Sequence, residues 1–181
     1  MDVRDALELI APAVRSGQTW ADLGAGTGTF TAALARLVGP AGAVHAVDRD
    51  ASCVRALEQL ARRIGHDSHI PIIVRRGDFT QPIDLPPLDG SLLANTLHFV
   101  PAPAQAEVLR RIAGHLDVHG AVVIVEYDHR PPSRWVPYPV SQPRLAVLAR
   151  QAALGPPELV GQRRSAFGGT MYAARLRMAA R

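Results

Sequence analysis

A glycine-rich stretch near the start of the chain, residues 20–30 (WADLGAGTGTF), limits what the sequence can fold into. Its first residues are typical of a short buried strand, and its last residues begin a helical pattern. Gly24, Gly26 and Gly28 stand between the two. Glycine adopts positive φ angles and has no Cβ, so the backbone can turn sharply there and approach a ligand closely. The stretch therefore predicts a strand, a tight turn and a helix whose free N–H groups converge on a ligand.

The spacing of the glycines separates two classes of ligand. In the dinucleotide-binding motif G-x-G-x-x-G the third glycine packs the helix against the strand, but Thr29 stands at that position here. Asp22 precedes the first glycine. Its carboxylate would repel a pyrophosphate but attract a ligand that carries an ammonium and a sulfonium group. The pattern therefore disfavours a dinucleotide.

The order D-x-G-x-G-x-G resembles motif I of the class I S-adenosylmethionine-dependent methyltransferases. The resemblance implies an α/β fold: a Rossmann-like three-layer sandwich with a seven-stranded, mostly parallel sheet whose last strand is antiparallel. It also implies S-adenosylmethionine as the cofactor, with Asp22, Gly24, Ala25, Gly26 and Gly28 in its binding site. A tight turn without any ligand is the alternative for this stretch.

Acidic residues follow the second and third predicted strands. Asp48 can accept two hydrogen bonds from a ribose diol, and it also matches the acidic residue of methyltransferase motif II. The resemblance places Arg49 against the adenine face, Asp78 on the adenine amino group and Phe79 against the adenine ring. An ordinary turn aspartate after Gly77 is the alternative for Asp78.

Polar residues also end the fourth and fifth predicted strands, at the edge where ligands of open α/β sheets bind. Asn95 and Thr96 lie at the carboxyl end of the fourth strand and are expected in the cofactor site. His98 is either a general base or a polar cap that faces the cleft. Asp128 and His129, after the fifth strand, are the other candidate bases.

A proline-rich segment after the fifth predicted strand, residues 130–139 (RPPSRWVPYP), is the least generic part of the chain. Proline makes it stiff and prevents a helix. Rigid aromatic rings and arginine suit a planar or anionic substrate, so Arg134, Trp135 and Tyr138 are the candidate substrate contacts. The polar residues 126–129 are placed either to contact a substrate or to begin a solvated loop. A loop that only covers the core is the alternative for the proline-rich segment.

The order of the predicted elements defines the fold class. Strand and helix patterns alternate to residue 154, which indicates right-handed βαβ crossovers and a parallel sheet between two layers of helices. A closing hairpin with its turn at Ser165–Gly169 adds one antiparallel strand. We expect a single domain over residues 1–181. The predicted helices span residues 3–15, 29–38, 51–64, 104–116 and 141–154, and the predicted strands span residues 19–23, 43–47, 70–75, 89–95, 121–125, 158–164 and 170–177.

Composition limits the class of partner. The net charge is +4, but every basic residue is arginine and the arginines are scattered, which favours a solvated surface over a nucleic-acid interface. The lone cysteine, Cys53, cannot form an internal disulfide, which fits a reducing compartment. No apolar run is long enough to span a membrane, and the first residues do not resemble a signal peptide. We therefore expect a cytoplasmic protein that binds neither nucleic acid nor a membrane.

The motifs and the composition together predict a methyltransferase that acts on oxygen, nitrogen or carbon of a small-molecule acceptor by in-line displacement. No metal site is expected, because the carboxylates do not fall where magnesium-dependent members of the family place theirs. The short N-terminal helix leaves the site open, or closed by a second subunit in a homodimer. Two alternatives stay open. One is a catalytically silent accessory protein that binds S-adenosylmethionine. The other is an NAD(P)-binding oxidoreductase, which the glycine spacing and the absence of lysine disfavour.

Overall fold

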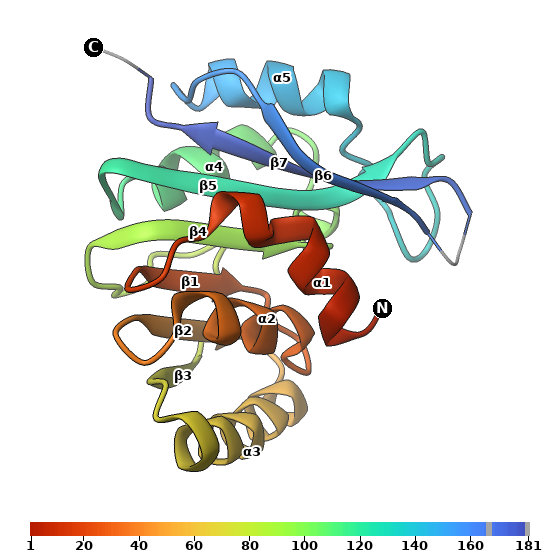
Figure 1. Ribbon diagram of the computed structural model, residues 1–181. Helices are drawn as coiled ribbons and strands as arrows, with labels where there is room; N and C mark the ends of the chain where they lie inside the picture. Colours follow the sequence, from red (N-terminus) through yellow and green to blue (C-terminus); the bar gives the residue numbers. More distant parts are fainter. Residues whose placement is uncertain (166–167, 180–181) are drawn as a thin grey trace.

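The computed structural model describes residues 1–165 and 168–179, and within these residues the strands form one seven-stranded sheet (Figure 1). The strand order is β3-β2-β1-β4-β5-β7-β6. Neighbouring strands from β3 to β5 run parallel, and β7 runs antiparallel to both β5 and β6. The predicted sheet with an antiparallel last strand is confirmed. The strands are β1 (Thr19–Leu23), β2 (Ala43–Asp48), β3 (Ile72–Arg76), β4 (Leu88–Ala94), β5 (Leu116–Asp128), β6 (Glu158–Arg164) and β7 (Thr170–Arg177).

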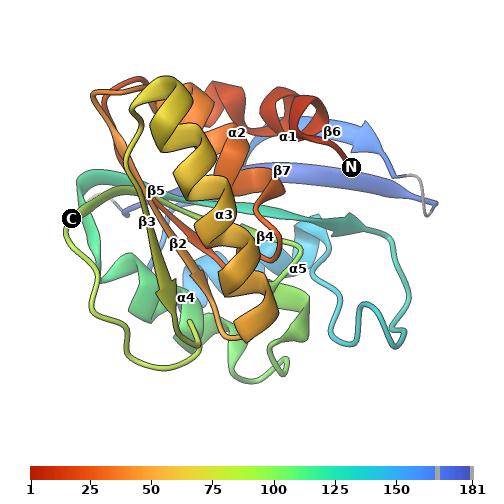
Figure 2. The ribbon, with the colours of Figure 1, turned by 90° about the horizontal axis from the view of Figure 1, so that it is seen from below.

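Helices cover both faces of this sheet (Figure 2). The first three α-helices lie on one face, and the last two lie on the other. Between β3 and β4 the chain forms no helix and runs as an irregular connector over residues 77–87. The helices are α1 (Val3–Ile10), α2 (Thr29–Val38), α3 (Ala51–Ser68), α4 (Gln105–Ala113) and α5 (Gln142–Gln151), with the short 3-10 helices η1 (Ala11–Ala13) and η2 (Leu97–Phe99).

The centre of the sheet is buried on both faces. The side chains of Val122–Val125 in β5 are fully buried and point alternately into the core under α4 and α5 and into the core under α1 and α2. Burying a side chain of this size contributes roughly 1.5–3 kcal/mol. Trp20 in β1 packs directly over Gly90 in β4, where a Cβ atom would lie 2.5 Å from the indole ring. This close approach requires glycine, and it joins β1 tightly to β4.

Several element boundaries differ from the predictions: α3 continues to Ser68 rather than residue 64, α4 ends at Ala113 rather than residue 116, and β3 begins at Ile72 rather than residue 70. Two further differences have local reasons. α1 ends at Ile10 rather than near residue 15, because Pro12 has no N–H to donate, and the chain continues as η1. β5 begins at Leu116 rather than residue 121, because the strand also includes residues 117–120. The pairing of β4 with β5 shifts register across this stretch, so it is accommodated as an irregularity of the ladder.

The closing hairpin forms as predicted from β6 and β7. Of its predicted turn, Ala166 and Phe167 lie outside the described residues. The carboxyl ends of the five parallel strands β1–β5 lie along one edge of the sheet. The proline-rich segment that follows β5 lies at the same edge (Figure 1). The candidate functional residues are therefore concentrated at this edge.

Candidate functional site

The carboxyl ends of β1 to β4 surround a first cavity of about 380 Å³. Its walls are the glycine-rich turn after β1, the ends of β2 and β3, and the segment after β4. Ligands of open α/β sheets bind in this position. The structure places nine of the eleven residues that the resemblance assigns to the cofactor on these walls: Gly24, Ala25, Gly26, Asp48, Arg49, Asp78, Phe79, Asn95 and Thr96.

The glycine-rich turn is fixed to the end of β2. The amides of Gly24 and Ala25 donate to the carbonyl oxygen of Val47 at 2.9 and 3.0 Å. Gly24 has φ +76°, and a Cβ there would lie 2.5 Å from Thr96 Cγ2, so only glycine fits. A Cβ at Gly26 would meet no atom within 4 Å. The backbone at Gly26 therefore borders open space in the first cavity.

Asp48 faces the first cavity with a carboxylate that the backbone holds in place. Its Oδ2 accepts from the amide of Gly26 at 2.8 Å, and its Oδ1 accepts from the amide of Asp50 at 2.9 Å. Asp50 in turn caps α3 by accepting from the amides of Ser52 and Cys53 at 2.7 and 3.2 Å. Each oxygen of Asp48 keeps a further lone pair for a ligand.

Asp78 and Arg49 form a charged pair that also lines the first cavity. The Oδ1 atom of Asp78 accepts from the amide and the hydroxyl of Thr80 at 2.9 and 2.7 Å. Its Oδ2 lies 3.8 Å from Arg49 Nη1. Burial raises the pKa of Asp78, but the hydrogen bonds from Thr80 and the charge of Arg49 together hold it below the usual value. Asp78 is therefore an ionised hydrogen-bond acceptor at neutral pH.

Asp22 and Gly28 do not line the first cavity but lie behind its turn. Asp22 is buried, and its Oδ2 accepts from the hydroxyl of Thr31 in α2 at 2.6 Å. Burial raises the pKa of Asp22 to about 7, against the lowering effect of the Thr31 hydrogen bond. Gly28, with φ +93°, precedes α2, and a Cβ there would lie 2.5 Å from Leu60 Cδ2 in α3. Both residues therefore support the glycine-rich turn through contacts with α2 and α3, on the side away from the first cavity.

A second cavity, of about 560 Å³, adjoins the first. It opens between η2, the end of β5 and the proline-rich segment. The two cavities share Asn95 and Phe99. The second cavity is lined mainly by aromatic and apolar side chains: Asn95, His98, Phe99, Tyr127, Arg130, Trp135 and Val136.

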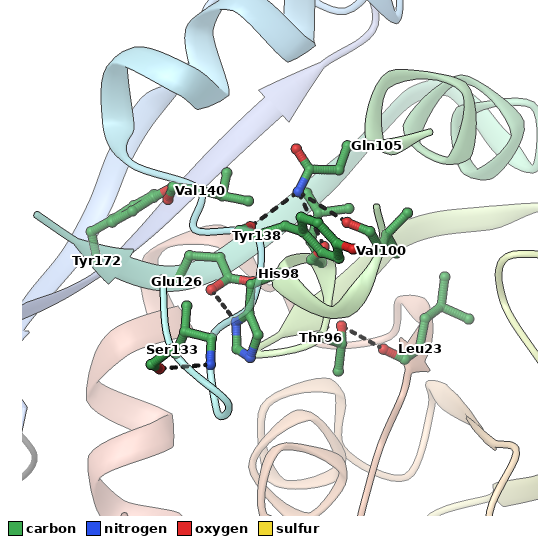
Figure 3. A network of polar contacts seen from close by, with 12 residues as sticks. Leu23, Thr96, His98, Val100, Gln105, Glu126, Ser133, Tyr138, Val140 and Tyr172 are labelled. Atoms are coloured by element: carbon green, nitrogen blue, oxygen red, sulfur yellow. Dashed lines mark hydrogen bonds and ion pairs between the residues drawn. The ribbon is translucent and has the colours of Figure 1, made fainter. Parts of the chain in front are cut away.

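His98 and Glu126 form a buried pair in the floor of the second cavity (Figure 3). Their side chains are 2% and 0% exposed. His98 Nδ1 donates to Glu126 Oε2 at 2.7 Å, and the backbone amide of His98 donates to Glu126 Oε1 at 3.1 Å. The other ring nitrogen, Nε2, points away from Glu126. In the neutral imidazole with its hydrogen on Nδ1, Nε2 is a proton acceptor.

Asn95 stands where the two cavities meet. It follows β4 with φ 56°, an uncommon conformation for a residue with a side chain. Its amide donates to the carbonyl oxygen of Val125 at 2.8 Å. Its Oδ1 atom is buried and has no hydrogen-bond partner among the described residues. Buried polar atoms are nearly always paired, so this acceptor points to a ligand or a water molecule.

Four of the other candidates line neither cavity. Asp128 is buried, and its two oxygens accept from the amide and the side chain of Gln142 at 3.2 and 2.8 Å. The side chain of His129 is 84% exposed and contacts Asp128. Arg134 lies 5.3 Å over the ring of its neighbour in the sequence. Tyr138 is held by its backbone amide, which donates to the carbonyl oxygen of His98 at 3.0 Å.

The structure also adds residues to which the sequence assigned no role. Glu126 and Tyr127 belonged to a polar run with two open interpretations, and Phe99 had no assigned role. Their common signal is position, because each lies at or just beyond the carboxyl end of a central strand. Only the fold shows that Glu126 meets His98, which stands 28 positions earlier in the chain.

Two kinds of feature are absent from the described residues. They contain no group of three or more histidine, cysteine, aspartate and glutamate side chains that could hold a metal ion. Over the same residues, no helix combines the length and the apolar character needed to cross a bilayer.

Comparison with known proteins identifies the fold. The structure of 1,6-didemethyltoxoflavin-N1-methyltransferase from Burkholderia thailandensis is similar with a TM-score of 0.76 and 23% identity, over 98% of this chain and 78% of that one. The structure of the CcbJ methyltransferase from Streptomyces caelestis is similar with a TM-score of 0.76 and 19% identity, over 99% of this chain and 90% of that one. The structure of the mitomycin 7-O-methyltransferase is similar with a TM-score of 0.73 and 21% identity, over 98% of this chain and 54% of that one. This chain therefore spans about half the length of that enzyme.

Sequence comparison identifies the family to which the chain belongs. No curated protein sequence gives a significant match. A family model described as a methyltransferase domain matches residues 21–120, which include the glycine-rich turn, Asp48, Asp78 and His98. The match covers more than half of the 181 residues, and the chain therefore belongs to the methyltransferase domain family.

Proposed function

We propose that this protein transfers a methyl group from S-adenosylmethionine to a small-molecule acceptor. The observation that carries the proposal is that the two cavities adjoin and share Asn95 and Phe99. A cofactor in the first cavity and an acceptor in the second would meet at this boundary. Methyl transfer in line depends on holding its two reactants in such an arrangement.

The residues of the first cavity fit this cofactor. Asp48 would accept hydrogen bonds from the ribose diol, Asp78 would accept from the adenine amino group, and Phe79 would pack on the adenine ring. The unpaired Oδ1 of Asn95 fits a donor such as the ammonium group of the cofactor. We assign no direct contact to Asp22, which supports the turn from behind.

The second cavity fits the acceptor. S-adenosylmethionine, when bound, supplies an electrophilic methyl group on a sulfonium. Correct placement of the acceptor by the chain would supply roughly 7–11 kcal/mol of the reduction in the barrier. His98 would take the acceptor's proton at Nε2, and Glu126 would orient the ring for that step. Of the three candidate bases only His98 lines a cavity, so Asp128 and His129 are not retained as bases.

A binding experiment tests the proposal. The purified protein is titrated by calorimetry with S-adenosylmethionine, S-adenosylhomocysteine, NAD and NADP. We expect the two adenosyl sulfur compounds to bind and to raise the free energy of unfolding by about 2.7 kcal/mol at a hundredfold excess over Kd. Asp48→Ala should abolish this binding, whereas Asp84→Ala, an exposed carboxylate of the connector, should leave it unchanged.

The alternatives give different results. Binding of the dinucleotides alone would overturn the proposal in favour of an oxidoreductase. If the adenosyl sulfur compounds bind but no acceptor from a broad panel receives labelled methyl, the protein is a silent accessory subunit. Failure of all four compounds to bind would also overturn the proposal.

A further inference from the structure

The walls of the second cavity indicate which molecules fit it. Phe99 and Trp135 are large apolar side chains with 52% and 72% of their surface exposed. They come from different parts of the chain, η2 and the segment after β5, yet both line this cavity together with Tyr127. Exposure of aromatic surface to water is unfavourable, so exposed rings that converge on one cavity mark a site for an apolar partner.

The rings around the proton acceptor favour a flat partner. The ring of His98 lies 4.4 Å from that of Phe99 at 51° and 6.2 Å from that of Tyr127 at 44°, measured between centroids. Aromatic rings gain energy from such tilted contacts. The exposed surface of this cavity is mostly apolar, although Asn95, His98 and Arg130 line it, and Arg130 lies 4.7 Å over the ring of Tyr127. A sugar or another polyhydroxylated molecule would find few hydrogen-bond partners here.

The walls are also held in fixed positions. The backbone amide of Tyr138 donates to the carbonyl oxygen of His98, which ties the proline-rich segment to η2. Ser133 and Val136 exchange two backbone hydrogen bonds, at 3.0 and 3.2 Å, around Trp135. A cavity with preformed walls binds a rigid molecule with little loss of conformational entropy, whereas a flexible chain loses more.

The basicity of the His98 imidazole further limits the class of methyl acceptor. An imidazole is a base of moderate strength, so it takes an acidic proton more readily than a weakly acidic one. A phenolic hydroxyl, like that of tyrosine, has a pKa of about 10, whereas an aliphatic hydroxyl is about as weak an acid as water, with a pKa of about 15.7. A hydroxyl attached to an aromatic ring is therefore a better match for His98 than an aliphatic alcohol.

We propose that the methyl acceptor is a planar aromatic compound whose ring carries the reacting hydroxyl group. The ring contacts Phe99 and Trp135, and the proton passes to His98 Nε2 while its electron pair stays on the acceptor atom. This inference rests on the proposed function and names the class of acceptor.

A matched pair of probes tests the aromatic requirement. The protein, saturated with S-adenosylhomocysteine, is titrated by calorimetry with 2-naphthol and with trans-2-decalol, which has the same skeleton and hydroxyl but no aromatic ring. We expect 2-naphthol to bind about tenfold more tightly, as aromatic contacts of ordinary strength allow. Trp135→Ala should remove most of this preference and Trp135→Phe should keep it. Val118→Ala, an exposed apolar position near the other end of β5, should have no effect.

A second probe tests the destination of the proton. 4-Nitrophenol reports its own ionisation, because only the phenolate absorbs visible light strongly. Bound to the protein that holds S-adenosylhomocysteine, it should ionise at lower pH than in buffer. His98→Gln should remove this shift while the probe still binds. An unshifted titration in the wild-type protein would overturn the role of His98.

The outcomes separate this inference from the proposed function. If S-adenosylhomocysteine does not bind, the proposed function fails and this inference fails with it. If S-adenosylhomocysteine binds but the two alcohols bind equally well, only the aromatic class of the acceptor is wrong.

Discussion

The Glu126 carboxylate is fully removed from solvent, and both of its oxygens serve a single residue, His98. A buried carboxylate is tolerated only where hydrogen bonds replace its hydration. Here these bonds also fix the ring and leave Nε2 as the proton acceptor. At the scale of residues, Glu126 is therefore a positioning residue that acts through His98.

Glu126→Gln tests this role with almost no change in volume. The amide nitrogen of the new side chain would face Nδ1, so the ring hydrogen would move to Nε2 and the proton acceptor would be lost. We expect kcat for an aromatic acceptor to fall by about 10²–10⁴-fold, the usual contribution of a general base. The Kd of S-adenosylhomocysteine should not change. Glu107→Gln, exposed on α4, is the control. A kcat close to that of the wild type would contradict the role of Glu126.

Asp22 gives a prediction about pH and stability. Its pKa is 3.8 in the unfolded reference and about 7 in the folded protein. Between these values the unfolded chain releases the proton that the folded chain keeps, so the free energy of unfolding falls as pH rises from about 4 to about 7. A shift of this size corresponds to roughly 4 kcal/mol.

Asp22→Asn should remove this fall in the free energy of unfolding with pH. The asparagine amide carries no charge, and its oxygen can still accept the hydrogen bond from Thr31. Urea unfolding of both proteins at several pH values measures the difference. We expect the variant to become more stable relative to the wild type as pH rises through this range, and the difference to level off above about pH 7. A difference that is constant with pH would show that Asp22 ionises normally in the folded chain.

At the scale of elements, one buried side chain joins the two walls of the second cavity. Gln105, at the start of α4, donates through Nε2 to the carbonyl oxygens of Leu97, Val100 and Tyr138 at 3.4, 3.3 and 3.2 Å (Figure 3). Its Oε1 accepts from Arg144 in α5 at 3.4 Å. η2, α4, α5 and the proline-rich segment therefore meet at Gln105, which lines neither cavity itself.

Gln105→Leu should loosen this junction without touching a ligand. Leaving buried carbonyl groups unpaired costs about 1–3 kcal/mol, so the variant should unfold at lower urea concentration. The affinity for 2-naphthol should fall, because the proline-rich segment that carries Trp135 loses its link to η2 through Gln105 and keeps only the bond between Tyr138 and His98. The affinity for S-adenosylhomocysteine should stay the same. Gln151→Leu, exposed at the end of α5, is the matched control. An equal loss of both affinities would instead indicate general unfolding.

The arrangement of the elements also explains which features could be predicted from the sequence. α2 and the strands β1 and β2 follow from periodic apolar patterns and the glycine turn, which are local properties of the chain. The pairing of Glu126 with His98 and the junction at Gln105 are not local, because each joins loops that follow different strands. Asp128 has the same polar character as Glu126 in the sequence, yet the path of the chain turns it to Gln142 and away from both cavities.

At the scale of the whole molecule, the alternation of strands and helices was sufficient to predict a parallel sheet and to place ligands at its carboxyl edge. It did not predict that this edge holds two adjoining cavities. That division depends on how far η2 and the proline-rich segment extend over the sheet, which proline and aromatic content alone do not determine. The predictions were therefore strongest for the first cavity, whose walls begin directly at strand ends, and weakest for the second.

The distribution of charge gives the last prediction. The net charge of +4 would attract nucleic acid only if the arginines formed a continuous surface. Instead several are neutralised locally: Arg163 pairs with Asp5, and Arg175 pairs with Glu158 at 2.7 Å. We expect no binding of duplex DNA tighter than about 10⁻⁴ M at about 0.15 M salt, the weak limit of non-specific binders. Fluorescence anisotropy of a labelled duplex measures this, with and without S-adenosylhomocysteine. Submicromolar binding that weakens steeply with salt would mean that the arginines act together, and the small-molecule acceptor would then have to be reconsidered.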